Sequence, residues 1–152
     1  MRSLGFVGLA LAFSLASCDP AAPTEPAEQP LPVLMSEPES VGMDPAKILE
    51  ARIEGDILTL KVSHGGGCRQ HESGLLYSGV LMKSLPPQTY LTLLHDANGD
   101  ACEALLTADL AFDLAPLRAA YSAVFTPHGT LVIHLRAPGS PGSVAATVVY
   151  TF

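Results

Sequence analysis

The sequence has few basic residues. It contains 8 Lys and Arg against 15 Asp and Glu, which gives a formal net charge of −7 at pH 7. Binding to nucleic acid depends on a cluster of basic side chains that neutralises phosphates. Residues 46–152 hold nine acids and seven bases with no basic cluster, and residues 19–45 hold six acids and no base. We therefore predict that nucleic acid is not a partner.

The sequence also lacks the motifs of several enzyme classes. There is no GxSxG nucleophile elbow, no HExxH motif and no phosphate-binding loop. Three consecutive glycines, Gly65 to Gly67, follow an expected strand, but no helix comes after them to bind an anion at its N-terminus. We predict no catalytic residue and no enzymatic activity.

The N-terminal apolar run is too short to span a bilayer. Leu4 to Leu15 is about a dozen residues long and follows the positive charge of Arg2, as in a secretory signal. It ends in Leu15-Ala16-Ser17-Cys18, which resembles the cleavage box of bacterial lipoproteins. That resemblance implies a signal peptide at residues 1–17 and lipidation (palmitate) of Cys18 as the mature N-terminus. The alternative is an ordinary signal peptide in which Cys18 is incidental.

Cysteine is scarce, with three residues in the whole chain. If Cys18 carries lipid, the even number that remains, Cys68 and Cys102, lies in an oxidising compartment, where disulfides form and persist. We predict that they form a disulfide between two loops. A nucleophilic Cys68 beside His71 is an enzymatic alternative that a second cysteine in such a compartment disfavours.

Residues 18–45 are predicted to be a disordered linker after the lipidated cysteine. Seven of the thirteen prolines lie between residues 19 and 45, among Ala, Glu and Ser, without a periodic apolar pattern. The globular domain is then expected at residues 46–152, long enough to bury a core of its own.

The domain is expected to be all-β. Short runs alternate between apolar and polar residues, and Gly, Pro, Asn and Asp separate them. The predicted strands are 49–54, 58–62, 75–82, 89–94, 106–114, 131–136 and 144–152. A helix starting at Asp44-Pro45 is the alternative for the first of them, one helical turn is expected at 116–121, and Asn98-Gly99 predicts a tight hairpin turn. No long amphipathic helix is available, so we predict an antiparallel β-sandwich of about seven strands, with a small barrel as second choice.

Histidines flank both predicted half-cystines. His64 and His71 enclose the Gly-rich loop, and His95 begins the loop that contains Cys102. Imidazole and thiolate are ligands for zinc or copper, although the sequence has no CxxC or HxxxH pair. The disulfide, a metal site and a disulfide with the three histidines clustered beside it all remain open.

The loop that begins at His95 also matches part of the sequence pattern of a calcium-binding loop. Asp96, Asn98 and Asp100 match positions 1, 3 and 5 of such a loop, but Ala101 and Thr107 replace the glycine and the glutamate that it requires. A turn explains this segment better than a calcium site.

Three short stretches of the sequence resemble those of a known family. They are the Gly66-Gly67-Cys68-Arg69-Gln70-His71 loop, Asp100 to Ala104 and Phe112 to Leu117. The domain is similar to the NigD-like bacterial lipoproteins with a GGC-x-x-H loop. The resemblance implies a secreted C-terminal β-sandwich, a disulfide that ties loops, and no established activity; it carries over no catalytic residue.

Together these observations predict a lipid-anchored protein of the cell envelope. Its disulfide-stapled β-sandwich would be a non-enzymatic binding or structural module with no cofactor, facing the periplasm from the inner or outer membrane or exposed at the cell surface. Its expected partners are the membrane, through the lipid anchor, and an envelope protein or small ligand. The alternative is an envelope protein that binds copper or zinc through His64, His71 and His95.

Overall fold

The computed structural model describes residues 29–38, 42–140 and 142–152. The predicted signal peptide, Cys18 and most of the predicted linker lie outside these residues. The described chain forms eight strands and one helix: β1 (Leu31–Pro32), β2 (Ala46–Glu54), β3 (Ile57–Gly66), β4 (Glu72–Tyr77), β5 (Gln88–Asp96), β6 (Ala104–Asp113), α1 (Ala115–Ser122), β7 (Thr130–Arg136) and β8 (Ala146–Thr151). In this part of the chain no helix is long and apolar enough to cross a membrane.

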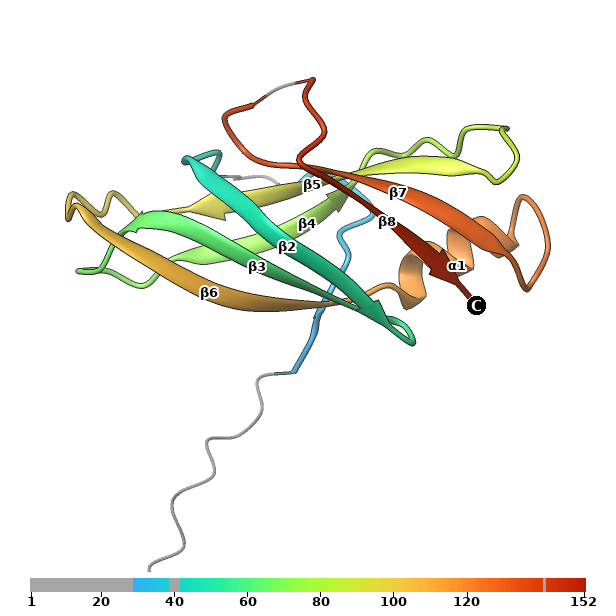
Figure 1. Cartoon of the computed structure of the whole chain (residues 1–152), viewed down its shortest axis with the longest axis horizontal. Helices are drawn as coiled ribbons and strands as arrows, with labels where there is room; N and C mark the ends of the chain where they lie inside the picture. The colour runs from blue at the N-terminus through green and yellow to red at the C-terminus, as the bar shows by residue number, and fades with distance from the viewer. Residues whose placement is uncertain (1–28, 39–41, 141) are drawn as a thin grey trace, which may run out of the picture.

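The strands form two four-stranded sheets that pack as a sandwich (Figure 1). One sheet has the order β1-β6-β3-β2 and the other has the order β4-β5-β7-β8. The predicted β-sandwich is confirmed, and each predicted strand has a counterpart. Both sheets are mixed, because β1 pairs with β6 and β5 pairs with β7 in parallel. The chain leaves the second sheet after β5, forms β6 in the first sheet, and returns through α1 to β7, which allows the parallel pair.

The core lies between the sheets and follows the period of two in the sequence. Alternate residues of one strand point to one face of a sheet, so each central strand sends an apolar row inward. The fully buried residues of these rows include Leu58, Leu60, Leu91, Leu131, Ile133 and Leu135. Burying each such side chain stabilises the fold by roughly 1.5–3 kcal/mol. The segment after Asp44 forms strand β2 and not the alternative helix.

The sandwich begins before residue 46, which corrects the predicted domain boundary. Leu31 and Pro32 pair with the end of β6, and Val33 is only 3% exposed. Leu34 then donates its N–H to the carbonyl of Leu75 and accepts the N–H of Tyr77, which adds it to the edge of β4. The segment therefore links an edge of each sheet, and Val33 is part of the core.

The turn predicted at Asn98-Gly99 is present, but it does not make a hairpin. Asn98 and Gly99 have φ angles of 52° and 65°, and the N–H of Asp100 donates to the carbonyl of Ala97. The strands on either side, β5 and β6, lie in different sheets. The turn therefore carries the chain from one sheet to the other.

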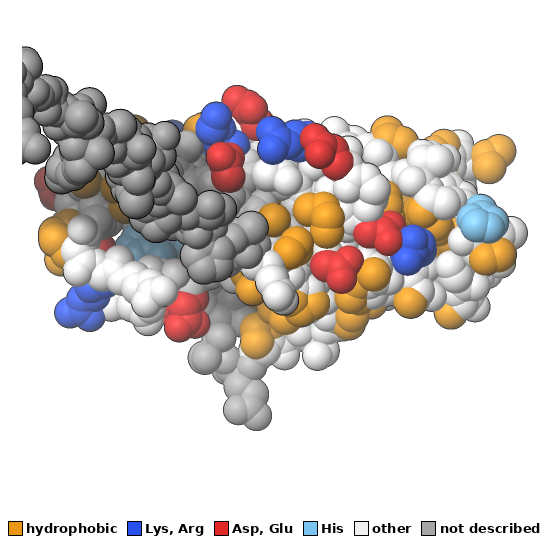
Figure 2. Space-filling view, turned by 90° about the horizontal axis from the view of Figure 1, so that it is seen from below, with side chains coloured by type: hydrophobic (Ala, Val, Ile, Leu, Met, Phe, Trp, Pro, Cys, Tyr) orange, Lys and Arg blue, Asp and Glu red, His pale blue; other side chains and the backbone are white. Residues whose placement is uncertain are grey.

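Charged side chains are mixed on the surface. Figure 2 shows one face of the molecule, where Lys and Arg lie beside Asp and Glu and exposed hydrophobic side chains lie between them. This face carries no continuous surface of one charge.

A partly exposed polar cluster lies where the β2–β3 hairpin meets β8 and α1. The hydroxyl of Tyr150, a residue without exposed surface, donates to the carboxylate of Asp56. Arg118 of α1 contacts the same carboxylate at 2.7 Å. Burial and the hydrogen bond to Asp56 both raise the pKa of Tyr150, so its hydroxyl keeps its proton and remains a donor.

We expect Tyr150→Phe to lower the free energy of unfolding by about 1.5–3 kcal/mol, because a hydrogen bond to a charged group is lost. Urea unfolding of both proteins measures the difference. Tyr90→Phe is the control, since no hydrogen bond of the Tyr90 hydroxyl is found among the described residues and its ring lies on the outer side, under Arg136. A Tyr150→Phe protein as stable as the control would show that this hydrogen bond does not stabilise the fold.

Candidate functional site

Three histidines form the last interior layer at one end of the sandwich. The inward row of β3 continues from Leu58, Leu60 and Val62 to His64, and the inward row of β5 ends at His95, which is 3% exposed. The third, His71, comes from the β3–β4 loop with a side chain 8% exposed. The ring centroids are 4.6, 4.6 and 5.0 Å apart. The structure thus brings together the three histidines that the sequence singled out.

A disulfide ties the two loops that surround these rings. Cys68 of the β3–β4 loop is bonded to Cys102 of the β5–β6 loop, with their Cα atoms 5.9 Å apart. The predicted pairing is present in the structure, so the two cysteines are not free thiolates. The histidines cluster beside a formed disulfide, which is the mixed arrangement left open by the sequence.

Asp100 organises the Gly-rich loop, a role that was not predicted from the sequence. One of its oxygens, Oδ2, accepts the backbone N–H groups of Gly67, Cys68 and Arg69 at 2.8–2.9 Å. The other, Oδ1, accepts the N–H of Cys102 at 2.9 Å. The Gly-rich loop is therefore an anion cradle filled by the chain's own carboxylate. The only sequence signal for Asp100 was its match to a calcium loop, which pointed to a different chemistry.

The hydrogen bonds to Asp100 keep it ionised. The N–H of Cys102 lowers its pKa most, and the N–H groups of Cys68 and Arg69 and the ring of His71 lower it further against the opposing effect of burial. An ionised carboxylate only accepts hydrogen bonds. The Nε2 atom of His71, which lies 3.2 Å from Asp100 Oδ2, must therefore carry a proton.

Gly66 makes room for this contact. Its φ of 133° is one that residues with a side chain rarely adopt. A Cβ atom at this position would lie 2.5 Å from Cε1 of His71 and 2.9 Å from Oδ2 of Asp100. The glycine is needed here because the backbone of the loop passes directly against the His71–Asp100 pair.

The other two rings are also anchored through one nitrogen. Nδ1 of His95 lies 3.3 Å from the backbone carbonyl oxygen of Asp44, and Nδ1 of His64 lies 3.0 Å from that of Gly65. A carbonyl oxygen only accepts, so both Nδ1 atoms are donors. Each ring thus donates one N–H to a fixed acceptor, and the remaining nitrogens of His71 and His95 face each other at 2.9 Å.

The environment of His95 opposes its protonation. Burial lowers its pKa below the ordinary value of 6.5, and the positive charges that His64 and His71 would carry lower it further. The carbonyl and carboxylate of Asp44 act in the opposite direction but have a smaller effect than burial. His95 is therefore a neutral imidazole at pH 7, the form that binds metals.

We expect the metal-free protein to lose stability as the pH falls below 6.5. The pKa of His95 is lower in the folded than in the unfolded chain, so the unfolded chain takes up its proton first. Urea unfolding at pH 7.5 and 5.5 with a chelator present measures the change. His95→Gln should remove part of the pH dependence; an equal dependence in the variant would show that other groups cause it.

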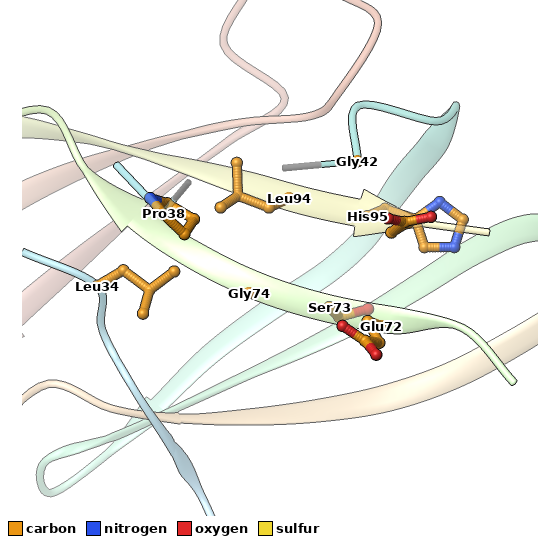
Figure 3. A pocket seen from close by; sticks show the side chains of 9 residues that line it. Leu34, Pro38, Gly42, Glu72, Ser73, Gly74, Leu94 and His95 are labelled. Carbon is orange, nitrogen blue, oxygen red and sulfur yellow. The ribbon is translucent and has the colours of Figure 1, made fainter. Parts of the chain in front are cut away.

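A pocket lies on the outer side of β4 and β5, next to the histidine cluster. Its volume is about 210 Å³, and the N-terminal segment forms one wall with Leu34, Pro38 and Gly42. Figure 3 shows that the ring of His95 points away from Leu34, Pro38 and Leu94. Leu94 and His95 both line the pocket, but neighbouring residues of a strand point to opposite faces, so the ring of His95 lies on the other face of the sheet from Leu94.

Comparison with known proteins identifies a similar family and similar folds. A family model described as the NigD-like C-terminal beta sandwich domain matches residues 29–125. This range includes β1, the disulfide and all three histidines, and it ends before β7. A search of curated proteins finds no match.

Three solved structures share the fold. A toxin-related protein from Parabacteroides distasonis has a TM-score of 0.52 at 19% identity, covering 81% of this chain and 61% of that protein. A NigD-like immunity protein from Bacteroides caccae has a TM-score of 0.54 at 18% identity, covering 80% and 57%. A protein of unknown function from Bacteroides vulgatus has a TM-score of 0.52 at 15% identity, covering 82% and 56%. The chain therefore spans about three fifths of the length of each of these proteins.

Proposed function

The chain belongs to the family of NigD-like C-terminal β-sandwich domains, and from this premise we propose that it is a lipid-anchored, non-enzymatic binding module of the cell envelope. The observation that carries the proposal is the Cys68–Cys102 disulfide. Disulfides persist outside the cytoplasm, and the remaining cysteine, Cys18, lies in the sequence context of a lipoprotein cleavage box.

The proposed anchor would hold the sandwich close to the membrane. The globular part begins at Leu31, so about a dozen residues separate it from Cys18. Even a fully extended chain of this length spans only about 45 Å. This linker is shorter than the one predicted from the sequence at residues 18–45, because Leu31 to Leu34 belong to the sandwich.

The end of the sandwich that carries the disulfide is suited to binding. The β3–β4 and β5–β6 loops meet there, and the disulfide and the Asp100 hydrogen bonds fix their conformation. A loop that is already ordered loses less conformational entropy when it binds a partner. We therefore place the binding surface at this end rather than at the end with Tyr150 and Asp56.

We expect Cys18→Ser to release the protein from the membrane fraction into the soluble fraction of the envelope. A serine cannot accept the thioether-linked lipid, and two or more acyl chains are what make such an anchor stable. Fractionation of cells followed by immunoblotting measures the change. Cys68→Ala together with Cys102→Ala is the matched control, because it removes the other two cysteines and should leave the protein on the membrane. A Cys18→Ser protein that stays membrane-bound would contradict the anchor.

A further inference from the structure

We propose that His64, His71 and His95 form a binding site for one zinc or copper ion. The proposal goes beyond the lipid-anchored module and does not depend on it, since the three rings belong to the folded domain. One ring nitrogen from each histidine lies within 4.8 Å of the other two. Three imidazole nitrogens that converge in this way are the donor set of many zinc and copper sites.

The hydrogen bonds of His71 and His95 determine which of their ring nitrogens carry a hydrogen. Nδ1 of His71 lies 2.9 Å from Nε2 of His95. His71 already donates its Nε2–H to Asp100, and His95 already donates its Nδ1–H to the carbonyl of Asp44. When both rings are neutral, the two facing nitrogens therefore both carry lone pairs. Two lone pairs at hydrogen-bond distance repel unless a cation lies between them.

A proton or a metal ion could supply that positive charge. The proton would create an imidazolium next to two other imidazoles, inside a layer where His95 is 3% exposed. A proton can join only two of the three ring nitrogens. A metal ion uses both of these lone pairs and has a third donor available in His64, whose Nδ1 is bonded to the Gly65 carbonyl and whose Nε2 is left free. The convergence of three nitrogens therefore fits a metal ion better than a proton.

The distances are compatible with metal ligation after small movements. Two nitrogens bound at 2.0–2.1 Å lie roughly 2.9 Å apart at a right angle and about 3.3 Å apart in a tetrahedral site. Nδ1 of His71 and Nε2 of His95 are 2.9 Å apart, which is the right-angle spacing. The longest separation in the group, up to 4.8 Å, must shorten by roughly 1.5 Å to reach tetrahedral spacing. Rotation of His64, the partly exposed ring at the end of β3, can provide it.

The oxygen atoms that accept hydrogen bonds from His71 and His95 are of the kind found around metal-bound histidines. A metal-bound histidine commonly donates its other N–H to a carboxylate or a carbonyl oxygen, which fixes the tautomer. His71 makes this bond with Asp100, and His95 makes it with Asp44. The carboxylates of Asp100 and Asp44 also bring negative charge close to the position of the ion without being needed as ligands.

Three imidazole nitrogens favour some metal ions over others. Neutral imidazoles favour zinc and copper, whereas calcium and magnesium require oxygen ligands. The cysteines next to the site are oxidised to a disulfide and offer no thiolate. We therefore expect binding of Zn(II) or Cu(II) and none of Ca(II) or Mg(II) at this site.

The test is a metal titration of the full-length mature protein in detergent. The protein is purified through a histidine-free affinity tag, stripped with a chelator and kept oxidised. Zn(II) and Cu(II) are then titrated in separate arms against a chromophoric chelator, with Ca(II) and Mg(II) as further arms. The variants are His64→Ala and His71→Ala, and His128→Ala in an exposed loop is the matched control.

We expect one equivalent of zinc or copper to bind, and the two arms show which is preferred. Affinity should fall by more than about 100-fold in His64→Ala and His71→Ala, beyond the range seen for outer-shell changes, and remain unchanged in His128→Ala. NMR of the wild-type protein with Zn(II) gives a result that does not depend on variant folding. The ring signals of His64, His71 and His95 should shift, while those of His128 and His134 should not.

Two results would overturn the proposal. One is a wild-type protein that binds neither metal in modest excess; the other is stoichiometric binding that leaves the signals of the three rings unchanged. Either result would leave the lipid-anchored module intact, because fractionation of Cys18→Ser tests the anchor separately. If fractionation contradicted the lipid anchor, the metal titration would still be valid, because the titration is carried out on purified protein.

Discussion

Replacement of both Cys68 and Cys102 by alanine is expected to lower the free energy of unfolding by about 3–4 kcal/mol. The two cysteines are 34 residues apart in the sequence. In the chain-entropy model, a cross-link over this length removes conformational freedom mainly from the unfolded chain. Both cysteines lie in loops between strands, so we expect the variant to fold with the same sandwich and to unfold at lower urea concentration.

Urea unfolding of the oxidised wild type and the double variant measures this effect. Cys18→Ser is the matched control, because it removes the cysteine that does not take part in the Cys68–Cys102 disulfide. Wild-type protein treated with a reductant should approach the double variant in stability. A loss below about 1 kcal/mol in the double variant would lie outside the usual range for a native disulfide and would show that the loops are held by their hydrogen bonds alone.

Asp100→Asn is expected to weaken metal binding by about 10–100-fold, the range for changes in groups that orient a metal ligand. The asparagine side chain cannot accept every hydrogen bond that the carboxylate accepts, because one of its two polar atoms is an NH₂ donor. The amide would face the N–H groups of Gly67, Cys68 and Arg69 as well as the ring of His71. Both the loop and the tautomer of His71 would lose their fixed partner.

Two measurements separate the loop from the metal in this variant. Amide hydrogen exchange at Gly67, Cys68 and Arg69 should become faster without metal, and the metal titration should show the lower affinity. Asp96→Asn is the matched control, because Asp96 is the last residue of β5, just before the same loop, and its side chain accepts only the N–H of Asn98 among the described hydrogen bonds. Equal metal affinity in Asp100→Asn and Asp96→Asn would show that Asp100 does not position His71.

The strands could be predicted from the sequence because their signal is local. In β3 and β7, each apolar residue that alternates with a polar one is buried in the sandwich. The burial of one face dictates this period whichever strand lies alongside. Strand partners leave no such local signal, and so the parallel pair of β5 with β7 and the separation of β5 from β6 were not predicted.

The short strand β1 was missed for a different reason. Leu31-Pro32 lies in a stretch rich in proline and acid, whose composition is typical of a linker. Its place in the fold comes from two sheet edges that need a partner, at β6 and β4. A segment with so little intrinsic preference for a strand becomes ordered only because those edges are already formed.

The sequence by itself determined the sandwich, the candidate disulfide and the three histidines of interest at its Gly-rich loop. These conclusions rest on periodicity, on the count of cysteines and on residue chemistry, all of which are local or additive. Only the tertiary structure decided that His64, His71 and His95 share one interior layer, and that Asp100 fills the glycine cradle. Residues 64, 71, 95 and 100 come from separate strands and loops, and their spacing along the chain contains no information about which ring nitrogen faces which. Residues distant in the sequence, Asp100 and Asp44, determine which nitrogen of His71 and of His95 donates a hydrogen bond. The proposed metal site depends on these hydrogen bonds.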